Sequence, residues 1–277
     1  MFDLRFVATS GATTTFETVL DASVPYLDDH RPGNDPLFGT TMGIALMTQA
    51  CSAVTPGKLW MPFDIELTAP VIVPAETEVV ANVHVVSSPN ECLVTVETFS
   101  DDGHVRGHCS ASFRASVAVD TRGHSDYRPT VASPAVYGLF FHGPAFQVVH
   151  SAALNDGDMW CEIAPTVASL WERGARGEPV AAQQIELCLQ TAGLLEVATS
   201  ERMMIPKRIS CIDRGTGNPS ASRIARARRS GQDSFDIELW DDAQQLVCRV
   251  VGYETQPLPF SSDAVALREL AAVFNAV

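Results

Sequence analysis

The sequence predicts an α+β fold made of two similar halves, each an antiparallel sheet wrapped around one central hydrophobic helix. Two segments, residues 37–54 and 182–199, are apolar on nearly every helical face, which is typical of a helix buried in a core. Each is followed by short runs in which apolar and polar residues alternate, separated by turn residues, as in antiparallel hairpins. Strands that follow a helix in series favour α+β over a doubly wound sheet.

The first half begins with a strand-like alternation at residues 16–24 and a polar turn at residues 28–33. After the first hydrophobic helix, four strand patterns follow at residues 63–67, 78–86, 92–99 and 108–119. Residues 120–133 are polar with few large apolar side chains, which indicates a linker. We therefore expect an N-terminal unit over residues 1–125.

The second half repeats this order. Strand patterns at residues 145–154 and 159–163 precede the second hydrophobic helix, and four more follow it, at residues 208–212, 222–228, 234–239 and 245–253. We expect a C-terminal unit over residues 126–260. The last segment, residues 261–277, has apolar residues at helical spacing and is expected to be a helix or a linker.

Composition narrows the class of protein. Of 277 residues, 46% are hydrophobic and 19% charged, which suits a packed core rather than disorder. No apolar run approaches the roughly 20 residues of a membrane span, and the first residues lack a signal-peptide pattern. The seven cysteines are scattered, which suits a reducing cytoplasm and neither disulfides nor a metal site. A net charge of −14 argues against nucleic-acid binding.

Glu186 is the first candidate for chemistry. Glu186 and Gln190 are four residues apart and share one face of the second helix, among apolar neighbours. A carboxyl group in such surroundings loses solvation, which raises its pKa towards neutral pH. The same spacing also fits an ordinary exposed glutamate on the outer edge of the helix.

His30 is the second candidate. It lies in the polar turn before the first helix, and an imidazole titrates in the range that a general base needs at neutral pH. A solvated turn histidine between Asp29 and Arg31 is the alternative interpretation. The related positions of His30 before one core helix and Glu186 within the other favour a common site.

Two further segments bear on function. In Phe140-Phe141-His142-Gly143-Pro144-Ala145-Phe146-Gln147, Gly-Pro predicts a tight turn and the aromatic residues could line an apolar channel. They could equally be core residues at the start of a strand. The second segment is a local cluster of basic residues, either a solvated strand face or a contact for an acidic partner: Arg223, Arg226, Arg228 and Arg229.

Three motifs in this order resemble the dehydratase domains of type I polyketide synthases and polyunsaturated fatty-acid synthases. Asp29-His30 is similar to the start of the D-H-x-x-x-G-x-x-x-x-P motif, although Asn34 stands at its glycine and Gly39 at its proline. Phe141-His142-Gly143-Pro144-Ala145-Phe146 is similar to Y-G-P-x-F. Glu186-Leu187-Cys188-Leu189-Gln190 is similar to D-x-x-x-Q, with Glu in place of the usual Asp. Ile205-Pro206 is similar to a Leu-Pro segment of the family.

The resemblance implies a double hot-dog fold and dehydration of a 3-hydroxyacyl thioester carried on the phosphopantetheine of an acyl carrier protein. It implies His30 as base and Glu186 as acid, without metal or redox cofactor. The implied supporting residues are Gly39 and Thr40 as backbone donors, Gln190, His142, Gly143, Pro144 and Phe146. The implied partners are the carrier protein, which the four arginines would contact, other synthase domains and a possible homodimer partner.

Other functions fit the same scaffold. The chain could close rings by oxa-Michael addition, move a double bond, or hydrate an enoyl thioester, although Phe38 stands where the hydratase signature has its histidine. A non-catalytic module that binds acyl chains or organises a synthase is the alternative from another class. An intact ionisable pair argues against that module, because burying such a pair without a function is costly.

Overall fold

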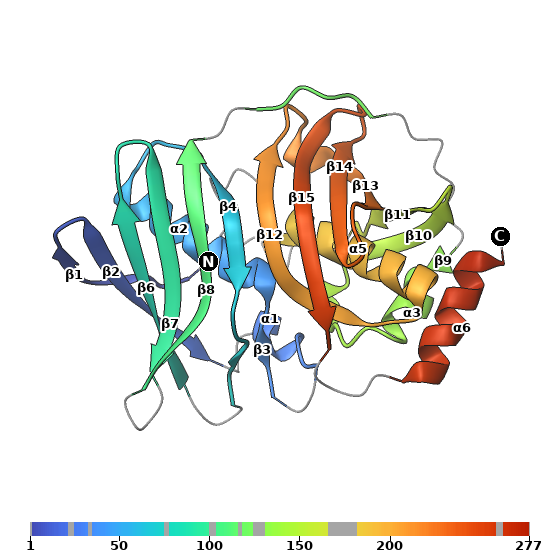
Figure 1. Ribbon diagram of the computed structural model, residues 1–277, viewed down its shortest axis with the longest axis horizontal. Coiled ribbons are helices and arrows are strands. Elements are labelled where there is room, and N and C mark those ends of the chain that lie inside the picture. Colours follow the sequence, from blue (N-terminus) through green and yellow to red (C-terminus); the bar gives the residue numbers. More distant parts are fainter. Residues whose placement is uncertain are drawn as a thin grey trace.

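The computed structural model describes residues 2–21, 25–32, 35–74, 78–99, 104–115, 118–123, 131–165, 182–258 and 263–276. Among these residues, thirteen strands form one sheet in the order β1-β2-β6-β7-β8-β4-β12-β15-β14-β13-β11-β10-β9. Every neighbouring pair in it is antiparallel. The sheet curves around two helices, α2 and α5, which lie one in each half of the molecule (Figure 1).

The N-terminal half contains the first of these helices, α2 (Thr40–Val54), which contacts four strands of its own half. Ten of its residues are buried, on all sides of the helix, as the uninterrupted apolar sequence requires. The strands of this half are β1 (Arg5–Ser10), β2 (Thr13–Asp21), β4 (Trp60–Leu67), β6 (Glu78–Ser87), β7 (Glu91–Phe99) and β8 (Val105–Ala115).

The C-terminal half contains α5 (Ala182–Ser200), which is buried along almost its whole length. A last helix, α6 (Ala264–Asn275), packs on α5 through Leu267, Leu270 and Phe274 at the outer edge of the molecule (Figure 1). The strands of this half are β9 (Val131–Ala132), β10 (Val149–Asn155), β11 (Asp158–Ile163), β12 (Met204–Arg214), β13 (Ser222–Arg229), β14 (Ser234–Asp241) and β15 (Leu246–Pro257).

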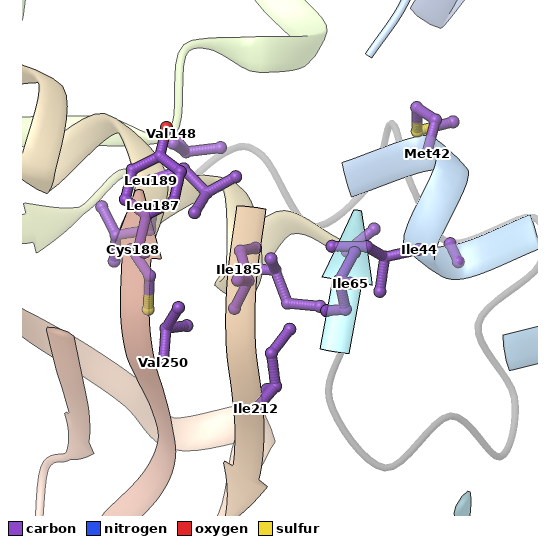
Figure 2. Packing of buried hydrophobic residues seen from close by; sticks show 14 of the residues in the cluster. Met42, Ile44, Ile65, Val148, Ile185, Leu187, Cys188, Leu189, Ile212 and Val250 are labelled. Atoms are coloured by element: carbon purple, nitrogen blue, oxygen red, sulfur yellow. The ribbon is translucent and has the colours of Figure 1, made fainter. Parts of the chain in front are cut away.

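The two halves meet where β4 pairs with β12, so the two predicted sheets are continuous. Helices α2 and α5 also contact each other at this junction. Figure 2 shows Ile44 of α2 and Ile65 of β4 in the same region as Ile185 of α5 and Ile212 of β12, and all four belong to one hydrophobic cluster. One core therefore connects both halves and fixes α2 relative to α5.

The first helix begins later than the sequence predicts. Leu37 and Phe38 form a short strand, β3 (Leu37–Phe38), which pairs with β5 (Val71–Ile72), and the helix starts only at Thr40. The predicted strand over residues 145–154 also starts later, because Pro144–Phe146 form a 3-10 helix, η1. In both places a Gly or Pro shapes a local turn that the apolar pattern conceals.

The predicted linker runs along the second half where it is described. Leu246 N–H donates to Thr121 O (3.0 Å) and Gly123 N–H donates to Gln244 O (3.0 Å). The predicted boundary between residues 125 and 126 lies outside the described residues, so the division into two units stays a prediction. In the parts of the chain that the structure describes, no helix is both long and apolar enough to cross a membrane.

Candidate active site

His30 is held in one orientation by the backbone of Leu37. Leu37 N–H donates to His30 O (2.8 Å), and the ring atom Nδ1 of His30 lies 2.7 Å from Leu37 O. Because a carbonyl oxygen only accepts hydrogen bonds, Nδ1 carries the ring proton. Nε2 of the neutral ring is therefore the atom that can accept a proton.

Aromatic rings surround the His30 imidazole, which is 8% exposed. The ring centroids of Phe146 and Phe141 lie 4.9 and 5.3 Å away. Gly39 covers another side, where an added Cβ would lie 3.2 Å from His30 Cε1. Burial lowers the pKa of His30 from 6.5 to about 4, against the opposing effect of the Leu37 hydrogen bond. The ring is therefore neutral at physiological pH.

Glu186 projects from α5 towards α2 and is 7% exposed. Thr41 Oγ1 donates to its Oε2 (2.9 Å), and Gln190 Nε2 donates to its Oε1 (2.8 Å). Burial raises the pKa of Glu186, although both hydrogen bonds act in the opposite direction. Its desolvated carboxyl group is thus shifted towards the protonated form, which can donate a proton.

Gln190 connects Glu186 to the second half of the site. Its Nε2 also donates to Phe146 O (2.8 Å), and its Oε1 accepts from Tyr137 Oη (2.8 Å). The Tyr137 hydroxyl in turn accepts from Val149 N–H (2.8 Å). All the polar atoms of the Gln190 amide are used, so Gln190 is held rigidly and orients Glu186.

The turn at Gly143 is packed against the residue before His30. Asp29 O accepts from Gly143 N–H, and Asp29 Oδ2 accepts from Ala145 N–H, both at 2.7 Å. A Cβ at position 143 would lie 2.7 Å from Asp29 Cγ, so only glycine fits there. His30 and His142 form an isolated antiparallel bridge, which places the His142 ring beside the site.

One cavity of about 190 Å³ joins these groups. Gly39 and Thr40 line it at the start of α2, where the first backbone N–H groups of a helix lack acceptors within the helix. Phe140 and Phe141 line it as the sequence predicts, whereas the predicted residues Gly143, Pro144 and Phe146 are not among its lining residues. The structure therefore brings together six of the predicted residues in the lining: His30, Gly39, Thr40, His142, Glu186 and Gln190.

The four arginines of β13 do not form a bare basic surface. Each lies within 4.0 Å of a carboxylate of Glu162, Glu238 or Glu196. The guanidinium of Arg226 also lies against the rings of Trp160 and Trp240, 5.3 and 5.2 Å from their centroids. A docking role for Arg223, Arg226, Arg228 and Arg229 stays a prediction, and their internal ion pairs weaken it.

Four residues of the site were missed by the sequence analysis: Asp29 as a support, the Leu37 carbonyl, Thr41 and Tyr137. Thr41 looks like one of many helix residues, and Tyr137 lies in a short helix, α3 (Ser133–Tyr137), with no signal of its own. The one available signal for Thr41 was its polar side chain within a helical segment that is otherwise largely apolar. In the described parts of the chain, no group of three or more side chains could hold a metal ion.

Known structures share this fold. The chain resembles the dehydratase domain from the CurF module of the curacin polyketide synthase, with 14% identity and a TM-score of 0.77 over 92% of this chain and 96% of that one. A trans-AT polyketide synthase dehydratase domain from Brevibacillus brevis gives 12% identity and a TM-score of 0.78, with the same coverage. The PpsC dehydratase domain from Mycobacterium tuberculosis gives 16% identity and a TM-score of 0.75, over 92% of this chain and 98% of that one.

These likenesses confirm the predicted double hot-dog fold. No curated protein sequence matches the chain significantly. A family model does match, that of the polyketide synthase dehydratase N-terminal domain, over residues 116–263. The matched segment includes Gly143 and Glu186 but not His30, and it spans more than half of the 277 residues. The chain therefore belongs to the polyketide synthase dehydratase family and is a dehydratase, a lyase of polyketide biosynthesis.

Proposed function

We propose that the chain converts a 3-hydroxyacyl thioester into the 2-enoyl thioester, with His30 as base and Glu186 as acid. The observation that carries this proposal is that the two side chains line one cavity with opposite protonation preferences. His30 is a buried neutral imidazole whose Nε2 can accept a proton, and burial raises the pKa of Glu186, which favours its protonated form. Two titratable groups whose pKa values are shifted in opposite directions are the expected pattern for separate acid and base roles.

In the proposed reaction, His30 Nε2 takes the proton from the α-carbon. The electron pair of that C–H bond forms the double bond between the α- and β-carbons while the bond from the β-carbon to its hydroxyl breaks. Glu186 gives its proton to the departing oxygen, which leaves as water. Proton transfers by positioned side chains contribute about 10²- to 10⁴-fold to such reactions.

The thioester oxygen gains negative charge as the α-proton leaves. We propose that the backbone N–H groups of Gly39 and Thr40 donate to it, because both residues line the cavity at the start of α2. Preorganised donors and the positive end of a helix stabilise such developing charge. Gln190 and Thr41 hold the carboxyl group of Glu186 in place.

Related proteins support these assignments. Variants of the CurK dehydratase in which a histidine is changed to phenylalanine or an aspartate to asparagine are described as inactive. Here Glu186 would replace that aspartate, and Thr41 and Gln190 each donate to one oxygen of its carboxyl group.

We propose that the substrate is carried on phosphopantetheine. The PpsC dehydratase domain is described in complex with C12:1-CoA, a thioester with the same arm. The partners of this chain would be an acyl carrier protein and other domains of a synthase in the cytoplasm, and a homodimer is a further expectation. The proposed proton transfers use only side chains and backbone donors, so we expect no cofactor.

The test is to incubate the protein with 3-hydroxyacyl carrier-protein thioesters of several chain lengths and to follow the loss of one water by mass spectrometry. We expect turnover that His30→Ala and Glu186→Gln abolish. Turnover that survives both changes would overturn the residue assignment. A cyclised product would indicate a ring-closing enzyme, and no turnover at any chain length would favour the non-catalytic module.

A further inference from the structure

His142 stands between the proposed base and the proposed acid. Its Nε2 lies 3.7 Å from Glu186 Oε1, and its ring centroid lies 5.3 Å from that of His30. Phe141 and Phe146 pack on the same ring, at 4.6 and 5.9 Å. His30 and Glu186 are therefore the titratable side chains that the described structure places against His142.

The two imidazoles differ in how their protons are held. Nδ1 of His30 is fixed by the Leu37 carbonyl, so His30 keeps one tautomer. Nδ1 of His142 is also buried, yet it has no hydrogen-bond partner among the described residues. Burying an unpaired polar atom costs about 1–3 kcal/mol, so this position calls for an explanation. Without a partner at Nδ1, no contact of the described chain fixes the tautomer of His142.

The proposed reaction leaves the site in the wrong protonation state. After water departs, His30 carries the proton from the α-carbon and Glu186 has lost its own. The next turnover requires the reverse arrangement, so one proton must move from His30 to Glu186. Both side chains are more than nine-tenths buried, and aromatic rings close off His30, which limits exchange with bulk water.

We propose that His142 is the relay that returns this proton. Protonated His30 gives its Nε2 proton to Nε2 of His142, and His142 then gives the same proton to Glu186 Oε1, which lies 3.7 Å from that nitrogen. His30 and His142 end neutral, Glu186 ends protonated, and His142 keeps its tautomer. The ring of His142 can turn between donor and acceptor because its Nδ1 has no fixed partner among the described residues. This inference rests on the proposed roles of His30 and Glu186.

The direction of transfer agrees with the electrostatics. Burial lowers the pKa of both imidazoles, and His30 when charged lowers the pKa of His142 further. Burial raises the pKa of Glu186. A proton on either imidazole is therefore less stable than a proton on the carboxyl group, so the relay runs downhill towards Glu186.

The test compares the first turnover with later ones. Enzyme equilibrated before mixing already holds the proton on Glu186, so its first turnover needs no relay. Rapid-quench experiments with enzyme in excess measure that turnover, and substrate in excess measures the steady state. His142→Phe keeps the ring and removes both nitrogens, whereas His142→Tyr restores a hydroxyl that can accept and release a proton. Gln147→Ala is the control, because Gln147 Nε2 donates to the backbone atom His142 O (3.1 Å), so this change leaves both ring nitrogens of His142 in place.

For His142→Phe we expect a first-turnover rate within about twofold of the original protein and a steady-state rate lower by about tenfold or more. His142→Tyr should recover part of the steady-state rate, and free imidazole should accelerate His142→Phe in the steady state alone. If His142→Phe lowers the first-turnover rate and the steady-state rate equally, His142 only positions the site. If it changes neither rate, His142 moves no proton. Either result overturns the relay. If His142→Phe fails to fold, the same comparison is made with His142→Gln. Turnover that survives His30→Ala would overturn the assignment of the base and the relay together.

Discussion

The buried His30 should make the stability of the protein depend on pH in a defined window. Its pKa is about 4 in the folded state, against 6.5 for a free imidazole. Because the folded-state pKa is depressed, the neutral ring carries no penalty above pH 6.5. As the pH falls from 6.5 towards 4, the unfolded chain binds a proton that the folded protein does not, so stability is lost.

The size of this loss follows from the linkage relation. At about pH 5, most unfolded molecules and few folded ones carry the His30 proton, which reduces the free energy of unfolding by about 2 kcal/mol relative to neutral pH. A glutamine at this position does not titrate. His30→Gln should therefore lose about 2 kcal/mol less stability than the original protein between about pH 7.5 and about pH 5.

Urea unfolding of both proteins at the two pH values measures this difference directly. The carboxyl groups and His142 are present in both proteins, so their contributions cancel to first order. His150→Gln is the control, since it removes an imidazole from the exposed surface of β10. A parallel pH dependence in His30→Gln and the original protein would refute the account of His30 as a desolvated neutral base.

Three further predictions concern the supports of the site and the last helix. Gly39→Ala should lower kcat by about tenfold with little change in far-ultraviolet circular dichroism, because the new Cβ would displace the His30 ring from Leu37. Tyr137→Phe should lower the free energy of unfolding by about 1–3 kcal/mol in urea titrations, since Gln190 Oε1 and Val149 N–H lose their shared partner. Phe274→Ala, which empties a fully buried position on α6, should cost about 3–5 kcal/mol and lower Tm in calorimetry.

The parts of the fold that were predictable from sequence are those with a long, unbroken hydrophobic pattern. Residues 37–54 and 182–199 have apolar side chains on all faces, and both became central helices, α2 and α5. The edge strand β1 was not predicted. All six of its residues are exposed, so it has no alternation between a buried and a solvated face for the sequence to display.

The site was predictable in its residue types but not in its connections. His30 and Glu186 lie 156 positions apart (186 − 30), and nothing local reveals that α2 brings Thr41 to the Glu186 carboxylate. Gly39 stands where the family motif has a proline, and the structure supplies a reason for this departure. A residue with a side chain there would press on the His30 ring at 3.2 Å. Asn34, the other departure, lies outside the described residues.

A single physical cause separates the proposed acid from the proposed base. Removing water from an ionisable group favours its uncharged form, which is the deprotonated form of an imidazole and the protonated form of a carboxylic acid. Burial against the same cavity therefore prepares His30 to accept a proton and Glu186 to donate one, without any charged neighbour. The hydrogen bonds to Leu37, Thr41 and Gln190 each oppose that shift, so their role is to aim the two groups. A substitution that admits water to the cavity should therefore move the pKa values of both groups towards their ordinary range and slow the reaction, even where no polar contact is lost.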